Sequence, residues 1–190
     1  ATSGGLHGVG ISVVNALSSE TVVEVARAKT LFRQSFARGV ALGPVAELGP
    51  TPNRRGTSVS FVPDPDIFGE HGRFKPARLH RLARSKAYLF AGVEIRWKCA
   101  PELIGDDTPT EAVFQFPGGL ADHLRDQLGS RECASAEPFV GRQDFPDEGG
   151  RAEWAIAWPL WSDGSYSWYC NTIPTPAGGT HEAGLRAALT

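Results

Sequence analysis

The feature that most restricts the possible folds of this sequence is a cluster of glycines close to its first residue. Four of the seven residues in the string GGLHGVG, residues 4–10, are glycines. Glycine allows positive φ angles and close approach of the backbone to a ligand. Apolar residues at near-helical spacing follow at once in residues 11–17. We therefore predict a glycine loop that runs directly into a short helix ending near Ser18 or Ser19.

The junction between loop and helix suits an anion. Backbone N–H groups and the positive end of the helix dipole converge at the start of a helix, and this geometry favours phosphate. The spacing fits neither the dinucleotide-binding string GxGxxG after a strand nor the string GxxxxGK[S/T], because no lysine closes the loop. Many glycine-rich segments are only turns, so the residues alone leave an ordinary turn as the alternative to a phosphate-binding loop.

Alternating apolar and polar residues predict strands in the first half of the chain. The predicted strands are residues 21–27, 31–36 and 57–62. The first two are expected to pair as a hairpin through Lys29-Thr30, and the third places Val59 and Phe61 on one face. Residues 39–56, which are rich in glycine and proline, predict a loop or a short irregular edge strand.

The second half of the chain mixes helices with strands. Helices are predicted at residues 76–91, at residues 119–128 and after residue 179, and strands at residues 93–97, 152–161 and 165–171. Asp163-Gly164, between the last two strands, is typical of a hairpin turn. Residues 129–151 are rich in glycine, proline and acidic residues, and we predict the domain boundary there.

Composition excludes several classes of protein. The chain has 190 residues, of which 41% are hydrophobic and 21% charged, and a formal net charge of -2. This is a globular composition, long enough for one ordinary domain or two small ones. The charge balance argues against a domain held on nucleic acid by charge alone. No apolar run reaches the roughly 18 residues of a membrane helix.

Two further observations bear on the origin of the chain. Cys99, Cys133 and Cys170 have neither disulfide-like nor zinc-like spacing, which fits a reducing compartment. The sequence has no methionine and starts inside a glycine-rich segment. We therefore expect it to be an internal segment of a longer protein.

Two patterns have both a structural and a functional interpretation. Basic residues line one face of the helix predicted at residues 76–91: Arg78, Arg81, Arg84 and Lys86. They could meet DNA phosphates, but a solvated helix face is the favoured interpretation. Aromatic residues between positions 154 and 169 could stack on bases, although their spacing along strands favours packing in a core or an interface.

The string GGLHGVGISVVNALS resembles the signature of the ATPase subunits of bacterial type IIA topoisomerases, which are the B subunits of gyrase and of topoisomerase IV. Three later strings agree with that family in the same order: LFRQSFARG, RGTSVSFVPDPDIF and YCNTIPTPAGGTHEAGLRAALT. The resemblance implies an α+β fold. Residues 1–130 would form the C-terminal part of the GHKL (Bergerat) ATP-binding domain, an α/β sandwich, and residues 131–190 the N-terminal part of the transducer domain.

The resemblance also implies an ATP-binding site. The loop of residues 5–11 would wrap the nucleotide phosphates, and His7 would donate a ring N–H to a terminal phosphate. Thr57 matches the threonine that supports adenine recognition, and Arg27 matches the arginine at the pocket mouth that coumarin-type inhibitors contact. The implied ATP-binding residues are Gly5, Leu6, His7, Gly8, Val9, Gly10, Ile11 and Thr57.

Other parts of the site are expected outside this sequence. In the family, the catalytic glutamate, the magnesium-binding asparagine and the adenine-reading aspartate precede the segment that matches residue 1. The transducer lysine that contacts the γ-phosphate follows the segment that matches residue 190. We therefore expect no catalytic residue and no metal ligand within the chain. Hydrolysis needs a base and a metal ion, so the chain alone is expected to be inactive.

The cofactors and partners follow from the resemblance as well. ATP and magnesium would serve a cytoplasmic type II DNA topoisomerase, an antibiotic target with no membrane partner. It would act on DNA as a homodimer of its ATPase region, together with the A subunit of topoisomerase IV or of gyrase; the resemblance favours topoisomerase IV. Two alternatives stay open: a chaperone or mismatch-repair ATPase of the GHKL superfamily, which shares the glycine loop but not the GGTHEAG string, and a nucleotide-free interaction module.

Overall fold

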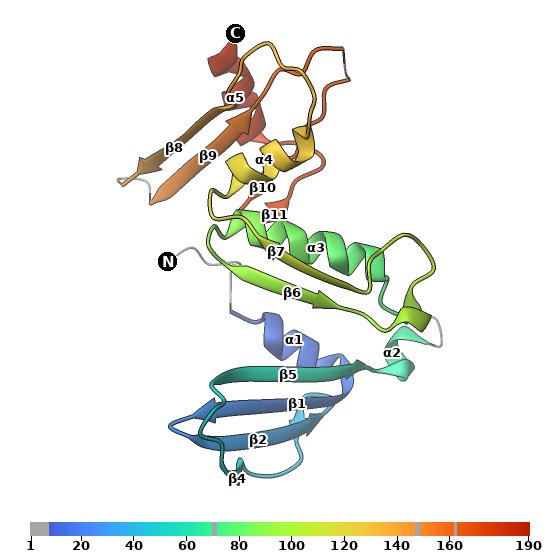
Figure 1. Cartoon of the computed structure of the whole chain (residues 1–190). Coiled ribbons are helices and arrows are strands. Elements are labelled where there is room, and N and C mark those ends of the chain that lie inside the picture. Colours follow the sequence, from blue (N-terminus) through green and yellow to red (C-terminus); the bar gives the residue numbers. More distant parts are fainter. Residues whose placement is uncertain (1–7, 70–71, 147–148, 162) are drawn as a thin grey trace. The chain divides into compact units, whose positions relative to one another are not determined.

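The computed structural model describes residues 8–69, 72–146, 149–161 and 163–190. Helices and strands are mixed in both halves of the chain, which confirms the predicted α+β class (Figure 1). Contacts between Cα atoms divide the chain into two compact units, residues 1–73 and residues 74–190, and each is described by itself. No helix in the described ranges is long and apolar enough to cross a lipid bilayer.

The first unit is an antiparallel sheet with a short helix at each end of its chain. Its elements are α1 (Gly10–Ala16), β1 (Ser18–Arg27), β2 (Thr30–Ala37), β3 (Val40–Ala41), β4 (Ala46–Pro50), β5 (Gly56–Pro63) and α2 (Pro65–Phe68). The strand order is β3-β2-β1-β5, and β4 also pairs with β2. The short helix after the glycines and the three predicted strands are thus confirmed, and the proline-rich stretch holds two short strands.

The hairpin between β1 and β2 turns one residue earlier than predicted. Arg27 pairs directly with Thr30, so the two turn residues are Ala28 and Lys29, with φ angles of 51° and 63°. A two-residue hairpin loop of this type needs positive φ at both central positions because that twist matches the flanking strands. The prediction of Lys29-Thr30 is therefore wrong, because alternation along each strand does not show which residues adopt the left-handed conformation.

The register of the sheet places the predicted residues of β5 on one face. Val25 lies opposite Thr57, Val23 opposite Val59, and Thr21 opposite Phe61. Side chains of directly opposed residues point to the same side of an antiparallel sheet. Val59 and Phe61 therefore share a face as predicted, and each is 40% exposed.

The described residues of the second unit form three helices and three two-stranded hairpins. Its elements are α3 (Pro76–Leu89), β6 (Glu94–Lys98), the 3₁₀ turn η1 (Pro101–Leu103), β7 (Glu111–Gln115), α4 (Leu120–Leu128), β8 (Phe139–Phe145), β9 (Gly150–Ile156), β10 (Tyr169–Cys170), β11 (Ile173–Pro174) and α5 (Thr180–Leu189). All three predicted helices are present, and α3 starts at Pro76, a residue that the first turn of a helix tolerates. The strand β7 was not predicted.

Aromatic side chains form the centre of the second unit. Tyr88 of α3 is 7% exposed and Phe114 of β7 is 8% exposed. His80, also on α3, meets the rings of Phe114 and Trp97 edge to face at centroid distances of 5.0 and 5.6 Å. Helix α3 therefore packs on the β6–β7 hairpin through rings on both partners.

The predicted hairpin around Asp163-Gly164 is wrong. β9 pairs with β8 in register from Phe139↔Ile156 to Phe145↔Gly150, and β10 pairs with β11 instead. β8 was not predicted, because the glycines and acidic residues around its segment indicated a loop. Gly141 supports the pairing because it lies opposite Trp154, and the ring of Trp154 leaves no room for a side chain at position 141.

Candidate functional site

The start of α1 has the geometry predicted for the end of the glycine loop. Gly8 has a φ of 66°, a left-handed conformation that glycine adopts without strain. A side-chain carbon added at Gly8 or Gly10 would meet no atom of the described residues within 4 Å. Val9 is the N-cap, and within the described residues α1 has no side-chain cap and no acidic residue in its first turn. The first N–H groups of the helix are therefore not occupied by a side chain of that part of the chain.

Of the other predicted residues of the loop, three lie outside the described residues and two are exposed. Gly5, Leu6 and His7 lie outside the described residues. Val9 is 52% exposed and Ile11 is 53% exposed, so both lie at the surface of the first unit.

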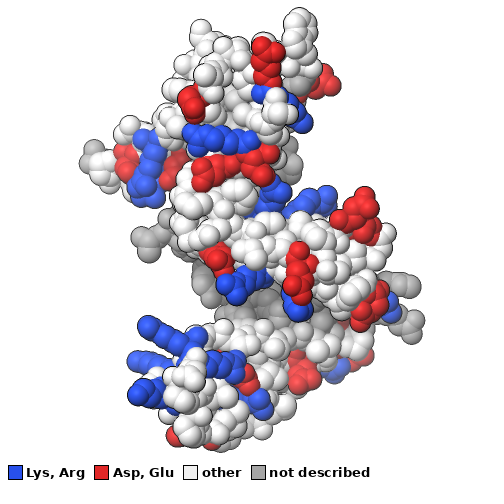
Figure 2. Space-filling view, viewed as in Figure 1, with Lys and Arg blue, Asp and Glu red and all other residues white. Residues whose placement is uncertain are grey.

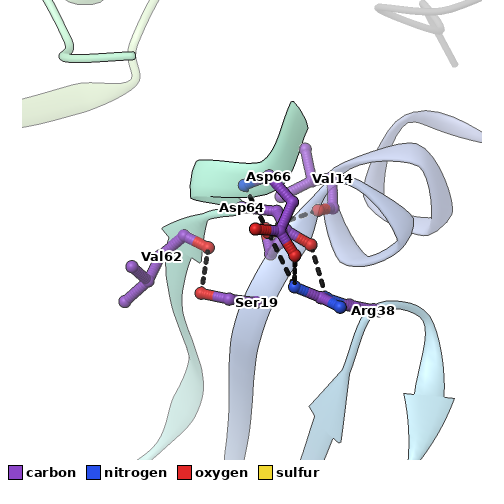
Figure 3. A network of polar contacts seen from close by, with 7 residues as sticks. Val14, Ser19, Arg38, Val62, Asp64 and Asp66 are labelled. Atoms are coloured by element: carbon purple, nitrogen blue, oxygen red, sulfur yellow. Dashed lines mark hydrogen bonds and ion pairs between the residues drawn. The ribbon is translucent and has the colours of Figure 1, made fainter. Parts of the chain in front are cut away.

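The C-terminal end of α1 is attached to three neighbouring segments by hydrogen bonds. Figure 3 shows the side-chain contacts of this region, among them those of Arg38 with Asp64 and Asp66. The hydroxyl of Ser18 donates to the carbonyl oxygen of Val14 at 2.6 Å. The backbone N–H of Asp64 donates to the carbonyl oxygen of Leu17 at 3.0 Å, and that of Arg38 donates to Ser18 at 2.9 Å. These bonds set the position of α1 against β1, the β2–β3 turn and the end of β5.

A buried carboxylate stands at the centre of this attachment. Arg38 Nε lies 2.6 Å from Asp64 Oδ2, and Arg38 Nη2 donates to Asp64 Oδ1 at 3.1 Å. The side chain of Asp64 is 2% exposed, and it also caps α2 by accepting the N–H of Asp66 at 3.0 Å. Arg38 pairs with Asp66 as well. The hydrogen bond to Asp64, followed by that to Asp66, raises the pKa of Arg38 above its usual range.

Sequence reasoning missed this network, although one signal was available. Asp64 stands between Pro63 and Pro65, and an aspartate directly before a proline at the start of a helix is a strong N-cap signal. The cap is present as that signal indicates. The partner Arg38 was not predictable, because it lies on a turn that is distant in the sequence.

Thr57 and Arg27 lie on the same face of the sheet. Thr57 is directly opposite Val25 on β1, and Arg27 follows Val25 by two residues. Both side chains are exposed. The register thus brings the two predicted contact residues to the same end of one face, although 30 positions separate them in the sequence numbering.

The same end of the sheet carries a concentration of positive charge. Figure 2 shows Lys and Arg side chains gathered where β1 turns into β2. The exposed basic residues there are Arg27, Lys29, Arg54 and Arg55. Glu24 pairs with Arg33 at 2.6 Å and with Arg54 at 2.8 Å. These hydrogen bonds, that from Arg33 first, hold the pKa of Glu24 below its usual range.

The basic face of α3 is divided between structural contacts and solvent. Arg84 pairs with Asp126 of α4, and the ammonium of Lys86 donates to Thr172. Arg78 and Arg81 are both exposed. Two of the four basic residues therefore stabilise the second unit, which argues against a continuous phosphate-binding stripe.

The described residues hold no metal-binding cluster. Among them, no group of three or more His, Cys, Asp or Glu side chains is close enough to hold a metal ion.

Comparisons with known proteins show which proteins this chain is similar to. Residues 119–190 match the family model described as DNA gyrase B. The whole chain is 53% identical to the B subunit of DNA topoisomerase 4 from Caulobacter vibrioides and covers 28% of that protein. The B subunit of DNA topoisomerase 4 from Bartonella bacilliformis is also 53% identical, over 99% of this chain and 27% of its own length. The chain belongs to the bacterial type IIA topoisomerase ATPase-subunit family.

Solved structures of the type IIA topoisomerase family share the fold. The 43K ATPase domain of Thermus thermophilus gyrase B, solved with an aminocoumarin, aligns with a TM-score of 0.77 and 34% identity over 96% of this chain and 48% of that one. The B-subunit of the DNA gyrase from Myxococcus xanthus aligns with a TM-score of 0.80 and 27% identity over 94% of this chain and 50% of its own. The chain thus spans about half of these structures and little more than a quarter of the two curated relatives.

Proposed function

We propose that this chain forms part of the ATP-binding site of a type II topoisomerase and the start of the domain that transmits ATP binding. Residues 1–130 would belong to the GHKL ATP-binding domain and residues 131–190 to the transducer domain. The observation that carries the proposal is the left-handed Gly8 before the uncapped start of α1, in a chain that is 53% identical to a topoisomerase 4 B subunit over its whole length.

The loop of residues 5–11 would hold the nucleotide phosphates. Gly8 and Gly10 leave open space beside the backbone, so phosphate oxygens can approach the N–H groups of the first helical turn. His7 would donate a ring N–H to a terminal phosphate oxygen. The dipole of α1 adds to this attraction, because anions are stabilised near the N-terminus of a helix.

Thr57 and Arg27 would contact the other end of the ligand. Their shared face and shared end of the sheet support a common role. The hydroxyl of Thr57 can donate to or accept from a base, and Arg27 can pair with an anionic or aromatic group at the mouth of the pocket. Arg27 would also be the residue that aminocoumarin-type inhibitors meet.

Hydrolysis would need groups that the described residues do not contain. Magnesium supplies charge neutralisation at the phosphates when it is bound, but the described part of the chain offers no ligand set for it. No step of the proposal therefore passes through the metal ion. We expect the chain to bind nucleotide without hydrolysing it.

The complete protein would be the B subunit of topoisomerase IV, working in the cytoplasm on DNA. The curated relatives from Caulobacter vibrioides and Bartonella bacilliformis carry that name, which supports topoisomerase IV over gyrase. It would hydrolyse ATP as a dimer of its ATPase region and pass one DNA duplex through another together with the A subunit.

A nucleotide titration tests the proposal. The purified chain is titrated with a non-hydrolysable ATP analogue and magnesium, beside the variants His7→Ala and Gly8→Ala. Losing a hydrogen bond to a charged group costs about 1.5–3 kcal/mol, which corresponds to a loss of affinity of about tenfold or more. Gly43→Ala is the matched control, because its side chain would also enter open space but its φ is not left-handed.

Each outcome decides the proposal. Saturable binding that weakens in His7→Ala and Gly8→Ala, and is unchanged in Gly43→Ala, supports the phosphate loop. Absence of binding by a folded, monodisperse chain contradicts the proposal that this segment binds nucleotide. Equal weakening in all three variants assigns the effect to general destabilisation and removes the support for the loop.

A further inference from the structure

Two side chains of α3 reach across the second unit to the β10–β11 hairpin. The ammonium of Lys86 donates to the carbonyl oxygen of Thr172 at 2.8 Å and to its hydroxyl at 3.1 Å. The hydroxyl groups of Tyr88 and Tyr169 share a hydrogen bond of 2.6 Å. The residues joined in this way are more than 80 positions apart in the chain. We name this set of four residues the α3–hairpin junction.

The junction is largely shielded from solvent. Tyr88 is 7% exposed and Thr172 is 9% exposed. The ring of Tyr88 stacks on His123 of α4 at a centroid distance of 3.7 Å, and it meets the ring of Tyr169 edge to face at 6.1 Å. Burial lowers the pKa of Lys86 and raises that of Tyr88. Because buried polar groups are costly when unpaired, these hydrogen bonds define one preferred arrangement of the hairpin on α3.

The hairpin turn held by Lys86 is conformationally unfavourable. Asn171 and Thr172 have φ angles of 48° and 67°. Asparagine tolerates the left-handed region, but threonine is β-branched and rarely adopts it. Such a conformation persists only where surrounding contacts hold it. Both donor contacts of Lys86 are to Thr172, so Lys86 supports the turn at its strained residue.

The hairpin is also continuous with the final helix. Thr175 donates its N–H to the carbonyl oxygen of Trp168 at 2.9 Å, and its hydroxyl contacts His181 Nε2 of α5 at 3.1 Å. The guanidinium of Arg186 lies over the ring of Trp168 at 5.8 Å. Residues 166–189 therefore form one structural piece, which we name the C-terminal module, and the α3–hairpin junction attaches this module to α3.

We propose that Lys86 and Tyr88 are positioning residues that couple the ATP-binding domain to the transducer domain. This inference rests on the proposed function, in which α3 belongs to residues 1–130 and the C-terminal module to residues 131–190. A movement of α3 is transmitted to the C-terminal module through the hydrogen bonds of two residue pairs and one edge-to-face ring contact. Neither residue touches the nucleotide; they act through the orientation of the module.

A double-mutant cycle tests the physical contact. Tyr88→Phe and Tyr169→Phe each leave one buried hydroxyl without its partner, whereas the double variant leaves two apolar rings. Each single substitution is expected to raise the unfolding equilibrium constant of the chain about fivefold. The double variant should be affected less than the product of the two. Tyr166→Phe is the control, because Tyr166 is 68% exposed. Additive effects of the two substitutions on the free energy of unfolding would contradict the hydrogen bond between the two tyrosines.

A coupling measurement tests the role. The complete protein, together with its partner subunit, is tested for ATP hydrolysis and for DNA strand passage. Lys86→Met keeps the apolar stem and removes the donor, and it should lower the number of strand passages per ATP hydrolysed about fivefold while hydrolysis changes less than about twofold. Lys86→Arg should restore most of the coupling, because arginine keeps the positive donor. Arg81→Met, at an exposed position of α3, is the matched control.

The possible results separate this inference from the proposed function. Unchanged coupling in Lys86→Met, an equal loss in Arg81→Met, or a parallel fall of hydrolysis and strand passage would overturn the coupling role. A wild-type protein that neither binds nor hydrolyses ATP would overturn the proposed function, and the coupling role with it.

Discussion

The two compact units are stabilised in different ways. In the described part of the first unit, the buried side chains are Ser18, Thr21, Ala26 and Asp64, so polar groups dominate. In that of the second unit they are Ala87, Tyr88, Phe114 and Thr172, with two large aromatic rings. The first unit is therefore organised by strand register and one charged network, and the second by ring contacts between segments distant in the sequence.

This difference indicates where each unit is sensitive to substitution. An antiparallel sheet keeps its backbone hydrogen bonds when an exposed side chain is shortened. A small aromatic centre loses transfer free energy and leaves a cavity when one ring is removed. Matched substitutions in the two units should therefore change the free energy of unfolding by different amounts.

The largest effect is expected for Phe114→Ala in the second unit. Phe114 is 8% exposed and contacts His80, so its removal should lower the free energy of unfolding by about 3 kcal/mol. Phe61→Ala in the first unit is the matched substitution, and it should cost less than about 1 kcal/mol because Phe61 is 40% exposed. Urea unfolding followed by circular dichroism measures both. Equal costs would contradict the contrast between the units.

An intermediate effect is expected for Asp64→Asn in the first unit. The substitution weakens the paired contact with Arg38 while it keeps a capping oxygen for α2. The free energy of unfolding should fall by about 2 kcal/mol, since hydrogen bonds to charged groups are worth more than neutral ones. Asp66→Asn is the control, and its effect should be within about 0.5 kcal/mol because that side chain is 70% exposed. Similar losses in both variants would rule out the central role of Asp64.

The smallest effect is expected from the protonation of His123. Burial, followed by the charge of Arg84, lowers the pKa of His123, and Asp126 opposes this shift only in part. The unfolded chain therefore binds the proton first as the pH falls below about 6.5, and the folded state loses stability from there down to the lowered pKa. His123→Phe keeps a ring stacked on Tyr88 and should reduce this pH dependence. The check is urea unfolding at a series of pH values from about 7.5 down to about 5; identical slopes in both proteins would contradict it.

Local signals in the sequence predicted much of the fold. Alternation identified β1, β2 and β5, and Pro76 marked the start of α3, because strand and helix periods are visible within a few residues. The prediction failed at β8, where the flanking glycines and acidic residues hid the strand, and at β10–β11, where the turn carries Asn171-Thr172 without a glycine. Turn conformation depends on φ angles that residue types favour without dictating.

The glycine string and its family resemblance could be read from residues 4–10 and the strings that follow, because glycines at closely spaced positions are visible in the sequence itself. The alignment of Thr57 with Arg27 on one face depends on strand register, which is set by pairing between segments and not by either strand. The contacts of Arg38 with Asp64 and of Lys86 with Thr172 likewise join residues 26 and 86 positions apart. Such contacts form only when the chain has folded, because their energy comes from burial that neighbouring residues in the sequence cannot provide.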